Sequence, residues 1–128
     1  MEIKEERDII LARRLARKIA KDLDFSLVNQ TRIATAVSEI TRNALTHGGG
    51  GVMKIKHTDN KKGLEIMISD EGNGIPDVEQ AMRNGYSTKD SLGLGLGGAK
   101  RLMDEFEINS RVGKGTIVTM RKFLPRRS

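Results

Sequence analysis

The sequence predicts an α+β fold, a two-layer sandwich in which helices cover one face of a sheet. Two long segments, residues 6–23 and 26–46, carry apolar side chains every three or four positions, as amphipathic helices do. From residue 52 onward the apolar side chains alternate instead, in two pairs of short segments joined by turns, which is typical of hairpins. Helices followed by hairpins favour an antiparallel or a mixed, mostly antiparallel sheet.

Two helices are expected in the N-terminal part of the chain. The first spans residues 6–23, with one apolar stripe at Ile9, Ala12, Ala16, Ile19 and Leu23. Residues 24–26 interrupt the pattern, and Ser26 is the expected cap of the second helix, which continues to about Thr46. His47 and four consecutive glycines then end it.

The rest of the chain is expected to form two hairpins separated by a loop and a helix. Period-two alternation predicts strands over residues 52–57, 64–69, 106–111 and 116–123. Between the hairpins we expect a glycine-rich loop at Asp70–Pro76, a short helix at 77–83, a flexible segment at 84–93 and a main helix at 94–105.

Length and composition indicate one globular domain over residues 1–128. Hydrophobic residues make up 37% and charged residues 31% of the chain, which allows both a core and a hydrated surface. No apolar run approaches the roughly 20 residues that span a bilayer, and no signal-type stretch follows the charged start. Because there is no cysteine for disulfides, a reducing cytoplasm is the expected location, and no membrane partner is expected.

The net charge of +6 raises the alternative of nucleic-acid binding. We regard that interpretation as the weaker one, because the basic residues are spread along the chain apart from a small cluster at Arg126 and Arg127. The chain also offers only three phenylalanines and one tyrosine for stacking on bases. A polyanionic small ligand or an acidic protein partner explains the charge equally well.

Glu39 and Asn43 form the first candidate site. Their spacing of four places both side chains on one helix face, beside the apolar stripe. An asparagine amide oxygen can ligate Mg²⁺, and a glutamate one turn earlier can orient or deprotonate a hydroxyl group or a water. The alternative is a surface pair that stabilises the helix by roughly 0.2–0.5 kcal/mol.

Asp70, Gly72 and Gly74 form the second candidate, in the loop sequence DEGNGIP. Alternation places Asp70 on the apolar face of the preceding strand, where a carboxylate needs a partner. The amino group of adenine is suitable, because it donates the hydrogen bond that a carboxylate accepts, and the glycines allow close backbone approach. Thr116, after the turn GKG, should face the same interior. The alternatives are an Asx turn at Asp70 and an ordinary strand threonine.

The glycine string SLGLGLGG, which runs into the last main helix, is the third candidate. Free backbone amides at a helix start, together with the helix dipole, can bind phosphate. The string alone is weak evidence, because dinucleotide-binding folds also use one. Here no buried strand precedes it, and the Lys-Ser/Thr ending of a Walker loop is absent.

The order of these motifs resembles the GHKL ATP-binding family, which includes gyrase-type ATPases, Hsp90, histidine-kinase catalytic domains and anti-sigma-factor serine kinases. The chain carries E-x-x-x-N on a helix, D-x-G-x-G after a strand, G-x-G-x-G before a helix, and G-T leading a strand. This resemblance spans nearly the whole chain. It implies the Bergerat-type ATP-binding fold, with ATP and Mg²⁺ as cofactors.

The resemblance also implies roles for the matching residues. Glu39 would be catalytic, as general base or orienting group, and Asn43 would ligate the Mg²⁺ bound to the phosphates. Asp70 would bind the adenine amino group, and Thr116 would support it through a water. Gly72 and Gly74 would line the base pocket. The glycine string, with Gly93, Leu94, Gly95, Leu96 and Gly97, would contact the phosphates.

By the same resemblance, residues 84–92 would form the ATP lid. Lys89 in this segment either reaches the γ-phosphate or stays in solvent. The anti-sigma pattern usually carries an arginine shortly before the glycine string, whereas this chain has Asp90-Ser91-Leu92 there. That departure leaves open how the lid holds the γ-phosphate.

Within the family, the chain resembles the small stand-alone serine kinases of bacterial partner switching, most of all the RsbT-type switch kinases of the stressosome. The stretches QTRIATAVSEITRNAL and NGYSTKDSLGLGLGGAKRLMDEF carry this likeness. It implies phosphorylation of a STAS-domain scaffold or antagonist of the RsbS or RsbR kind, and activation of a PP2C-type phosphatase of the RsbU kind. The sibling class of RsbW-type anti-sigma factors shares every motif and would bind a sigma factor.

The resulting expectation is an ATP- and Mg²⁺-dependent serine/threonine kinase that acts on a partner protein. The rival from another class is a binding switch, in which ATP sets a conformation and no phosphoryl group moves. Glu39 favours the kinase, because a switch that only binds needs no base.

Overall fold

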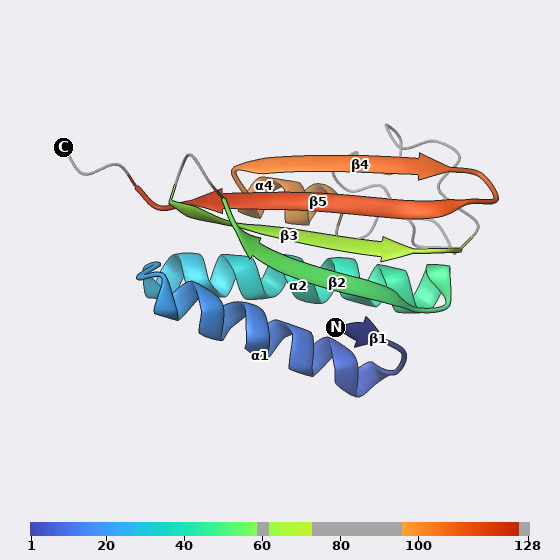
Figure 1. Ribbon diagram of the computed structural model, residues 1–128, viewed down its shortest axis with the longest axis horizontal. Coiled ribbons are helices and arrows are strands. Elements are labelled where there is room, and N and C mark those ends of the chain that lie inside the picture. Colours follow the sequence, from blue (N-terminus) through green and yellow to red (C-terminus); the bar gives the residue numbers. More distant parts are fainter. Residues whose placement is uncertain (59–61, 73–95, 126–128) are drawn as a thin grey trace.

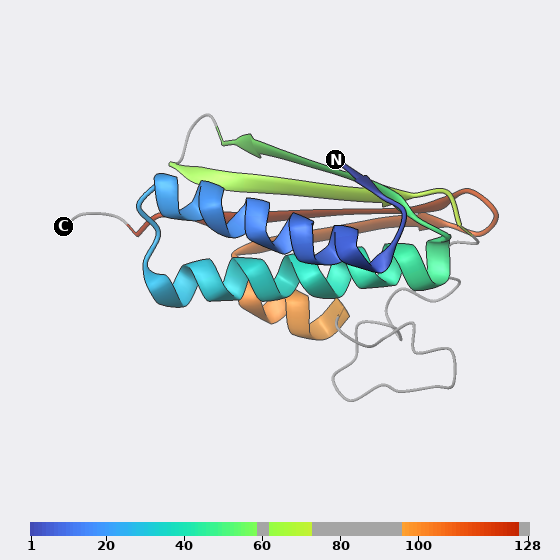
Figure 2. The ribbon, with the colours of Figure 1, turned by 90° about the horizontal axis from the view of Figure 1, so that it is seen from below.

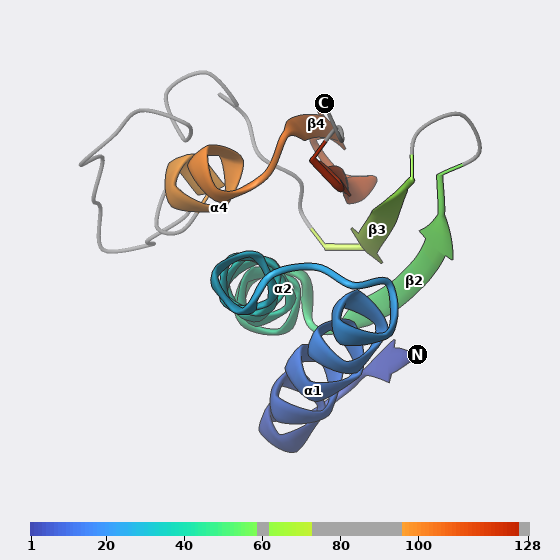
Figure 3. The ribbon, with the colours of Figure 1, turned by 90° about the vertical axis from the view of Figure 1, so that its left-hand side faces the viewer.

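The computed structural model describes residues 1–58, 62–72 and 96–125, and within these ranges a five-stranded sheet carries three helices on one face (Figures 1 and 3). The strands, in the order in which they pair, are β1 (Glu2–Ile3), β2 (Gly51–His57), β3 (Gly63–Asp70), β5 (Gly115–Phe123) and β4 (Glu105–Arg111). The helices are α1 (Glu6–Asp22), α2 (Leu27–Gly48) and α4 (Leu96–Leu102). The predicted α+β two-layer sandwich is confirmed.

The two long helices form where the apolar period predicts them. The carboxylate of Asp8 accepts the backbone N–H groups of Lys4 (2.8 Å) and Glu5 (3.1 Å) at the start of α1. Ser26 caps α2 as expected, since its Oγ accepts the N–H of Asn29 at 3.1 Å. The two helices lie side by side beneath the sheet (Figure 2).

The second helix is two residues longer than the sequence pattern indicates. It continues through His47 and Gly48, and it ends at Gly49, which takes the left-handed conformation with φ of 72°. Glycine adopts that conformation without steric cost, so the helix ends at the second of the four consecutive glycines.

All four strand pairings are antiparallel, which narrows the expected sheet to a wholly antiparallel one among the described residues. The central pair is β3 with β5, in which Ile68 faces Val118 and Ile66 faces Met120. These side chains point toward the helices and form the core together with the apolar stripes of α1 and α2. Within the described ranges, no helix is long and apolar enough to cross a membrane.

Two features differ from the sequence-based expectation. Strand β1 has only two residues, too few for an alternation pattern, and it is held on β2 by two hydrogen bonds of 2.8 Å between the backbones of Met1 and Met53. The last main helix, expected to reach residue 105, ends at Leu102, because Glu105 already pairs in β4. The expected short helix at 77–83 and flexible segment at 84–93 lie outside the described residues.

Candidate functional site

A pocket opens on the helix side of the sheet, where β3 and β5 meet the C-terminal half of α2 and the first residue of α4. The space between its walls is about 450 Å³, open solvent included. The residues that line it are Ile40, Asn43, Ala44, His47, Gly48, Ile68, Asp70, Leu96, Thr116 and Val118. Four candidates from the sequence, namely Asn43, Asp70, Leu96 and Thr116, therefore meet in one place.

Asp70 ends β3 and brings a half-buried carboxylate to an otherwise largely apolar pocket. Its Oδ1 accepts the N–H of Gly72 at 2.9 Å, so the Asx turn weighed as an alternative does form. Burial raises the pKa of the Asp70 carboxyl above its ordinary value, while the backbone amides of Gly72 and Thr116 and the nearby His47 oppose that rise. The carboxylate thus shapes its own loop and also lines the pocket.

Thr116 lies directly opposite Asp70 in the β3–β5 register. Its Oγ1 is 2.8 Å from the Oγ of Ser110, which occupies the matching position on β4. The three neighbouring strands therefore place a carboxylate and two hydroxyl groups in one row across the sheet. Ser110 was not among the sequence candidates, because only the pairing of β4 with β5 brings it beside Thr116.

Two glycines allow the loop after Asp70 to pack against the end of α2. A Cβ on Gly48 would collide with Cγ of Asp70, and a Cβ on Gly72 would lie 2.5 Å from Cα of Gly48. Both contacts are closer than non-bonded carbon atoms come, so a side chain at either position would force its neighbour to move. Gly72, expected to line the base pocket, holds the backbone of the Asp70 loop close to the helix.

Glu39 and Asn43 lie one turn apart on α2, and both side chains are partly buried. Asn43 lines the pocket, whereas Glu39 is not among the lining residues. Since a turn of helix rises about 5.4 Å, the Glu39 carboxylate lies one turn from the pocket residue Asn43 along α2. The geometry is compatible with a Glu39 role toward a group that enters beside the pocket.

The glycine-rich candidates divide into two groups. Leu96 and Gly97 are the first residues of α4, both are buried, and the Leu96 side chain lines the pocket. The candidates Gly74, Lys89, Gly93, Leu94 and Gly95 lie outside the described residues. The expected lid at 84–92 lies outside them as well.

Sequence reasoning missed His47 and most of the apolar wall of the pocket. His47 was taken as a helix-end residue, and it lines the pocket because α2 continues past it to Gly48. Ile40 and Ala44 were assigned to the helix stripe, and the signal that they also line a site was their position next to Asn43. Ile68 and Val118 lie two positions from Asp70 and Thr116, so strand alternation put them on the same face, and the pairing of β3 with β5 brings them together.

The pocket combines apolar walls with one hydrogen-bond-accepting carboxylate among its lining residues, which suits a flat aromatic ring that carries an amino group. Among the described residues, no group of three or more His, Cys, Asp and Glu side chains could hold a metal ion. The Asn43 amide fits a different kind of site, since Mg²⁺ commonly takes one or two protein ligands and completes its shell with substrate phosphates and water.

Comparison with known proteins agrees with this geometry. Residues 4–122 match the family described as Histidine kinase-like ATPase domain. Serine/threonine-protein kinase RsbT of Bacillus subtilis (strain 168) is 48% identical over 124 residues, which cover 95% of this chain and 93% of that protein. Anti-sigma F factor of Thermoanaerobacter sp. (strain X514) is 35% identical over 119 residues, covering 88% of this chain and 83% of that protein.

Solved structures show the same fold at lower identity. The catalytic domain of histidine kinase ThkA superposes with a TM-score of 0.60 at 16% identity, over 96% of this chain and 94% of that one. The mycobacterial sensor histidine kinase MprB gives a TM-score of 0.60 at 20% identity, over 73% of this chain and 71% of that one. At such identities the likeness concerns the fold alone.

Proposed function

The chain belongs to the family of histidine kinase-like ATPase domains, and on that premise we propose that it phosphorylates a STAS-domain partner in the cytoplasm. It is a serine/threonine-protein kinase that uses ATP, because its family is one of kinase-like ATPase domains and it is 48% identical to a kinase of that name. Residues 1–128 would act as a single ATP-binding domain. The observation that carries the proposal is the half-buried Asp70 carboxylate at the base of the apolar pocket.

Adenine recognition is the first part of the proposal. Asp70 would accept a hydrogen bond from the adenine amino group, and Thr116 would support this contact through a water. The apolar side chains of Ile40, Ile68 and Val118 would cover the ring faces. Burial of the Asp70 carboxylate is costly, and a ligand that donates a hydrogen bond to it offsets that cost.

Phosphoryl transfer is the second part. Asn43 would hold the Mg²⁺, which when bound neutralises charge on the phosphates. Glu39, one turn earlier on α2, would accept the proton of the attacking serine or threonine hydroxyl group. Phosphoryl transfer depends mainly on positioning and charge neutralisation, so the partner that brings the hydroxyl group completes the site.

The phosphate contacts are the third part. Gly74 would line the base pocket, and the amides of Gly93, Leu94, Gly95 and Gly97 would bind phosphate oxygens at the start of the last helix. Leu96 lines the pocket, so the start of α4 lies next to the proposed base site. Lys89 is proposed to reach the γ-phosphate from a lid formed by residues 84–92.

We propose the partners that the resemblance to RsbT-type switch kinases implies. The acceptor would be a STAS-domain scaffold or antagonist of the RsbS or RsbR kind, and the released kinase would bind and activate a PP2C-type phosphatase of the RsbU kind. The 48% identity to a protein named as a serine/threonine kinase over nearly the full length of both chains supports this choice. The alternative is an anti-sigma factor that holds a sigma factor, which the 35% identity to Anti-sigma F factor supports.

The test is transfer of label from γ-labelled ATP, with Mg²⁺, to STAS-domain proteins of the same genome. We expect label on a serine or threonine of one STAS protein, and we expect Glu39→Ala to slow transfer by about 100-fold while ATP affinity stays unchanged. Glu107→Ala, an exposed residue of β4 on the opposite face of the sheet, is the matched control.

Transfer at the normal rate by Glu39→Ala would show that Glu39 is not the base. If ATP binds and no STAS protein is labelled, the binding-switch or anti-sigma alternative replaces the kinase proposal. Capture of a sigma factor in the presence of ATP is then the next measurement.

A further inference from the structure

Strand β2 has an edge that the rest of the molecule covers only in part. β1 pairs with Gly51 and Val52, and Met1 exchanges two backbone hydrogen bonds of 2.8 Å with Met53. In an antiparallel strand, backbone groups of alternate residues point to the same side. The N–H and C=O groups of Ile55 and His57 therefore point away from β3, and among the described residues no strand pairs with them.

An exposed apolar surface of α1 lies beside this edge. The carboxylate of Asp8 accepts the N–H groups of Lys4 and Glu5, so the Asp8 face of α1 is turned toward the chain that leaves β1. Leu11 and Leu15 follow Asp8 by three and seven positions and thus share that face. They are 46% and 39% exposed.

The opposite side of α1 is the one that contacts α2. Arg17 donates to Thr31 of α2 at 2.7 Å, and a rotation of about 100° per residue puts Leu15 nearly opposite Arg17 around the helix. Figure 3 shows α1, β1 and β2 on one flank of the molecule, with α2 on the other side of α1. Leu11 and Leu15, here called the α1 floor, therefore lie on the side of α1 that faces away from α2, the flank on which Figure 3 shows β1 and β2.

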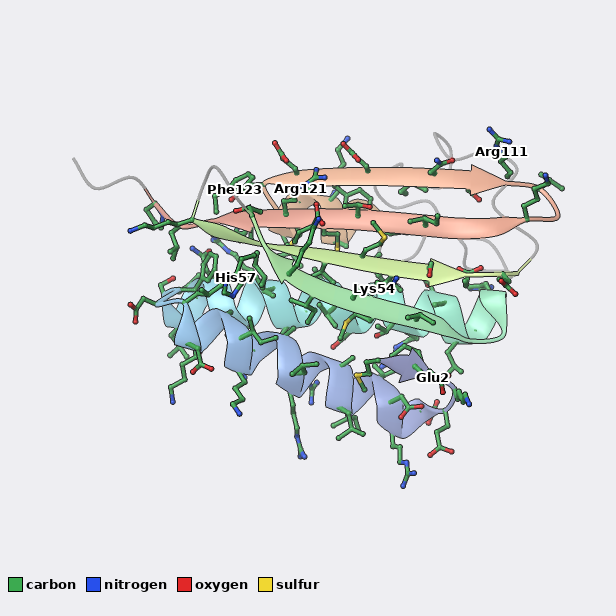
Figure 4. All side chains as sticks on the ribbon, viewed as in Figure 1. Glu2, Lys54, His57, Arg111, Arg121 and Phe123 are labelled. Carbon is green, nitrogen blue, oxygen red and sulfur yellow. The ribbon has the colours of Figure 1, made fainter. Side chains whose placement is uncertain are left out.

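Lysine side chains lie on both sides of the open β2 edge, on the outer face of the sheet and on α1. Lys54 and Lys56 of β2 point to the outer face of the sheet and are exposed (Lys54 is labelled in Figure 4). Lys56 approaches Glu65 at 3.3 Å, whereas Lys54 has no salt bridge with any described residue. Lys18, one turn beyond Leu15 on α1, is also exposed. The surface thus offers free backbone groups, an apolar floor and lysines.

We propose that the open edge of β2 binds an extended acidic segment of a partner protein as an added antiparallel strand. Directly opposed residues in a sheet share a face. Residues opposite Ile55 and His57 would point toward the α1 floor and be apolar, and residues opposite Lys54 and Lys56 would point outward and be acidic. Backbone hydrogen bonds supply affinity in this mode of binding, and the alternating side chains supply specificity.

A second copy of the chain fits this edge poorly. Two β2 edges paired antiparallel about Ile55 would set Lys54 of each copy opposite Lys56 of the other, and like charges directly opposite are destabilising. Each copy also carries a net charge of +6. Lysines on an edge strand are a known protection against such self-pairing, which leaves an oppositely charged strand as the occupant.

The test uses an eight-residue peptide of alternating valine and glutamate, added to the full chain, with binding measured by amide shifts in NMR and by fluorescence anisotropy. We expect the largest shifts at Ile55 and His57. We expect Lys54→Glu to weaken binding at least tenfold and Ile55→Pro, which removes an outward N–H group, to do the same. Lys114→Glu, an exposed turn residue, is the control with the same charge change.

The site shares no residue with the pocket, so ATP affinity should stay the same in all three variants. An equal loss with Lys114→Glu, or shifts outside β2 and α1, would overturn the proposal. So would equal binding of a peptide of alternating valine and lysine. Sedimentation that shows a dimer abolished by Ile55→Pro would assign the edge to a second copy instead. Should Ile55→Pro fail to fold, Lys54→Glu still decides the outcome.

Discussion

The inner face of the β3–β5 pair carries a buried or half-buried charged residue near each end, and the two residues differ in their partners and surroundings. At one end, Lys122 is 7% exposed, and its Nζ donates to the carbonyl of Leu102 at 2.9 Å and approaches the carboxylate of Asp104 at 3.5 Å. At the other end, the Asp70 carboxylate accepts backbone amides and faces a pocket, and burial raises its pKa.

We infer from this difference that Lys122 stabilises the fold and that Asp70 serves binding. Lys122 ties the end of α4 to β5, and the second Asp104 oxygen accepts the N–H of Phe123 at 2.8 Å, so this cluster is complete without a ligand. Asp70 lines the pocket, and among the described residues it forms no salt bridge. A half-buried charge without an opposite charge is the one to examine for function.

The largest expected effect is a loss of ATP affinity when Asp70 is changed. Asp70→Asn should weaken ATP binding by about 100-fold, because a hydrogen bond to a charged acceptor contributes roughly 1.5–3 kcal/mol. Asp104→Asn, the matched change at the other end, should leave ATP affinity within about threefold, the scatter expected away from a site. Isothermal titration calorimetry measures both, and equal losses in the two variants would erase the distinction.

The second prediction concerns the stability of the fold when Lys122 is changed. Lys122→Met should lower the free energy of unfolding by about 2 kcal/mol, because it leaves the Leu102 carbonyl without its donor and the Asp104 carboxylate without its cation. Urea unfolding followed by circular dichroism gives this number. A stability equal to wild type, together with lost ATP binding, would reverse the roles that we assign to the two ends.

A smaller effect is expected at the glycine that supports Asp70. A Cβ at Gly48 would collide with the Asp70 carboxyl group, so Gly48→Ala should cost about 1 kcal/mol of stability, the lower end for overpacking, and reduce ATP affinity as well. Gly98→Ala is the control, because no described atom lies within 4 Å of its Cβ and the residue is inside α4. That change should stabilise the chain by roughly 0.5–1 kcal/mol.

The smallest expected effect concerns pH. Because the folded pKa of Asp70 is raised, the folded state keeps the proton to a higher pH than the unfolded chain, whose value is near 3.8. The stability from Asp70 is thus present in full below pH 3.8 and is lost as the pH rises through the folded pKa. Urea unfolding from pH 3.5 to 8 should show wild type losing stability relative to Asp70→Asn as the pH rises, and a wild type that instead gains stability relative to Asp70→Asn would contradict the raised pKa.

Local pattern was sufficient to predict the two long helices, the two hairpins and the inward face of Asp70 and Thr116. Each depends on a period of 3.6 or 2 that a short window of sequence contains. It was insufficient for β1, whose two residues carry no period, and for the end of α4, where pairing in β4 overrides the helical pattern. In both cases a contact with a distant segment decides the local conformation.

For the site, the sequence by itself determined which residue types are present and in which order, from Glu39 through Asp70 to Thr116, because motif spacing is a property of the chain. Only the tertiary structure decided that Asp70 lies against Gly48, that Ser110 joins Thr116, and that His47 lines the pocket. The first relation joins distant segments, the second depends on the register of the β4–β5 hairpin, and the third depends on where α2 stops. Strand register and close packing set them, and neither can be read from a local pattern.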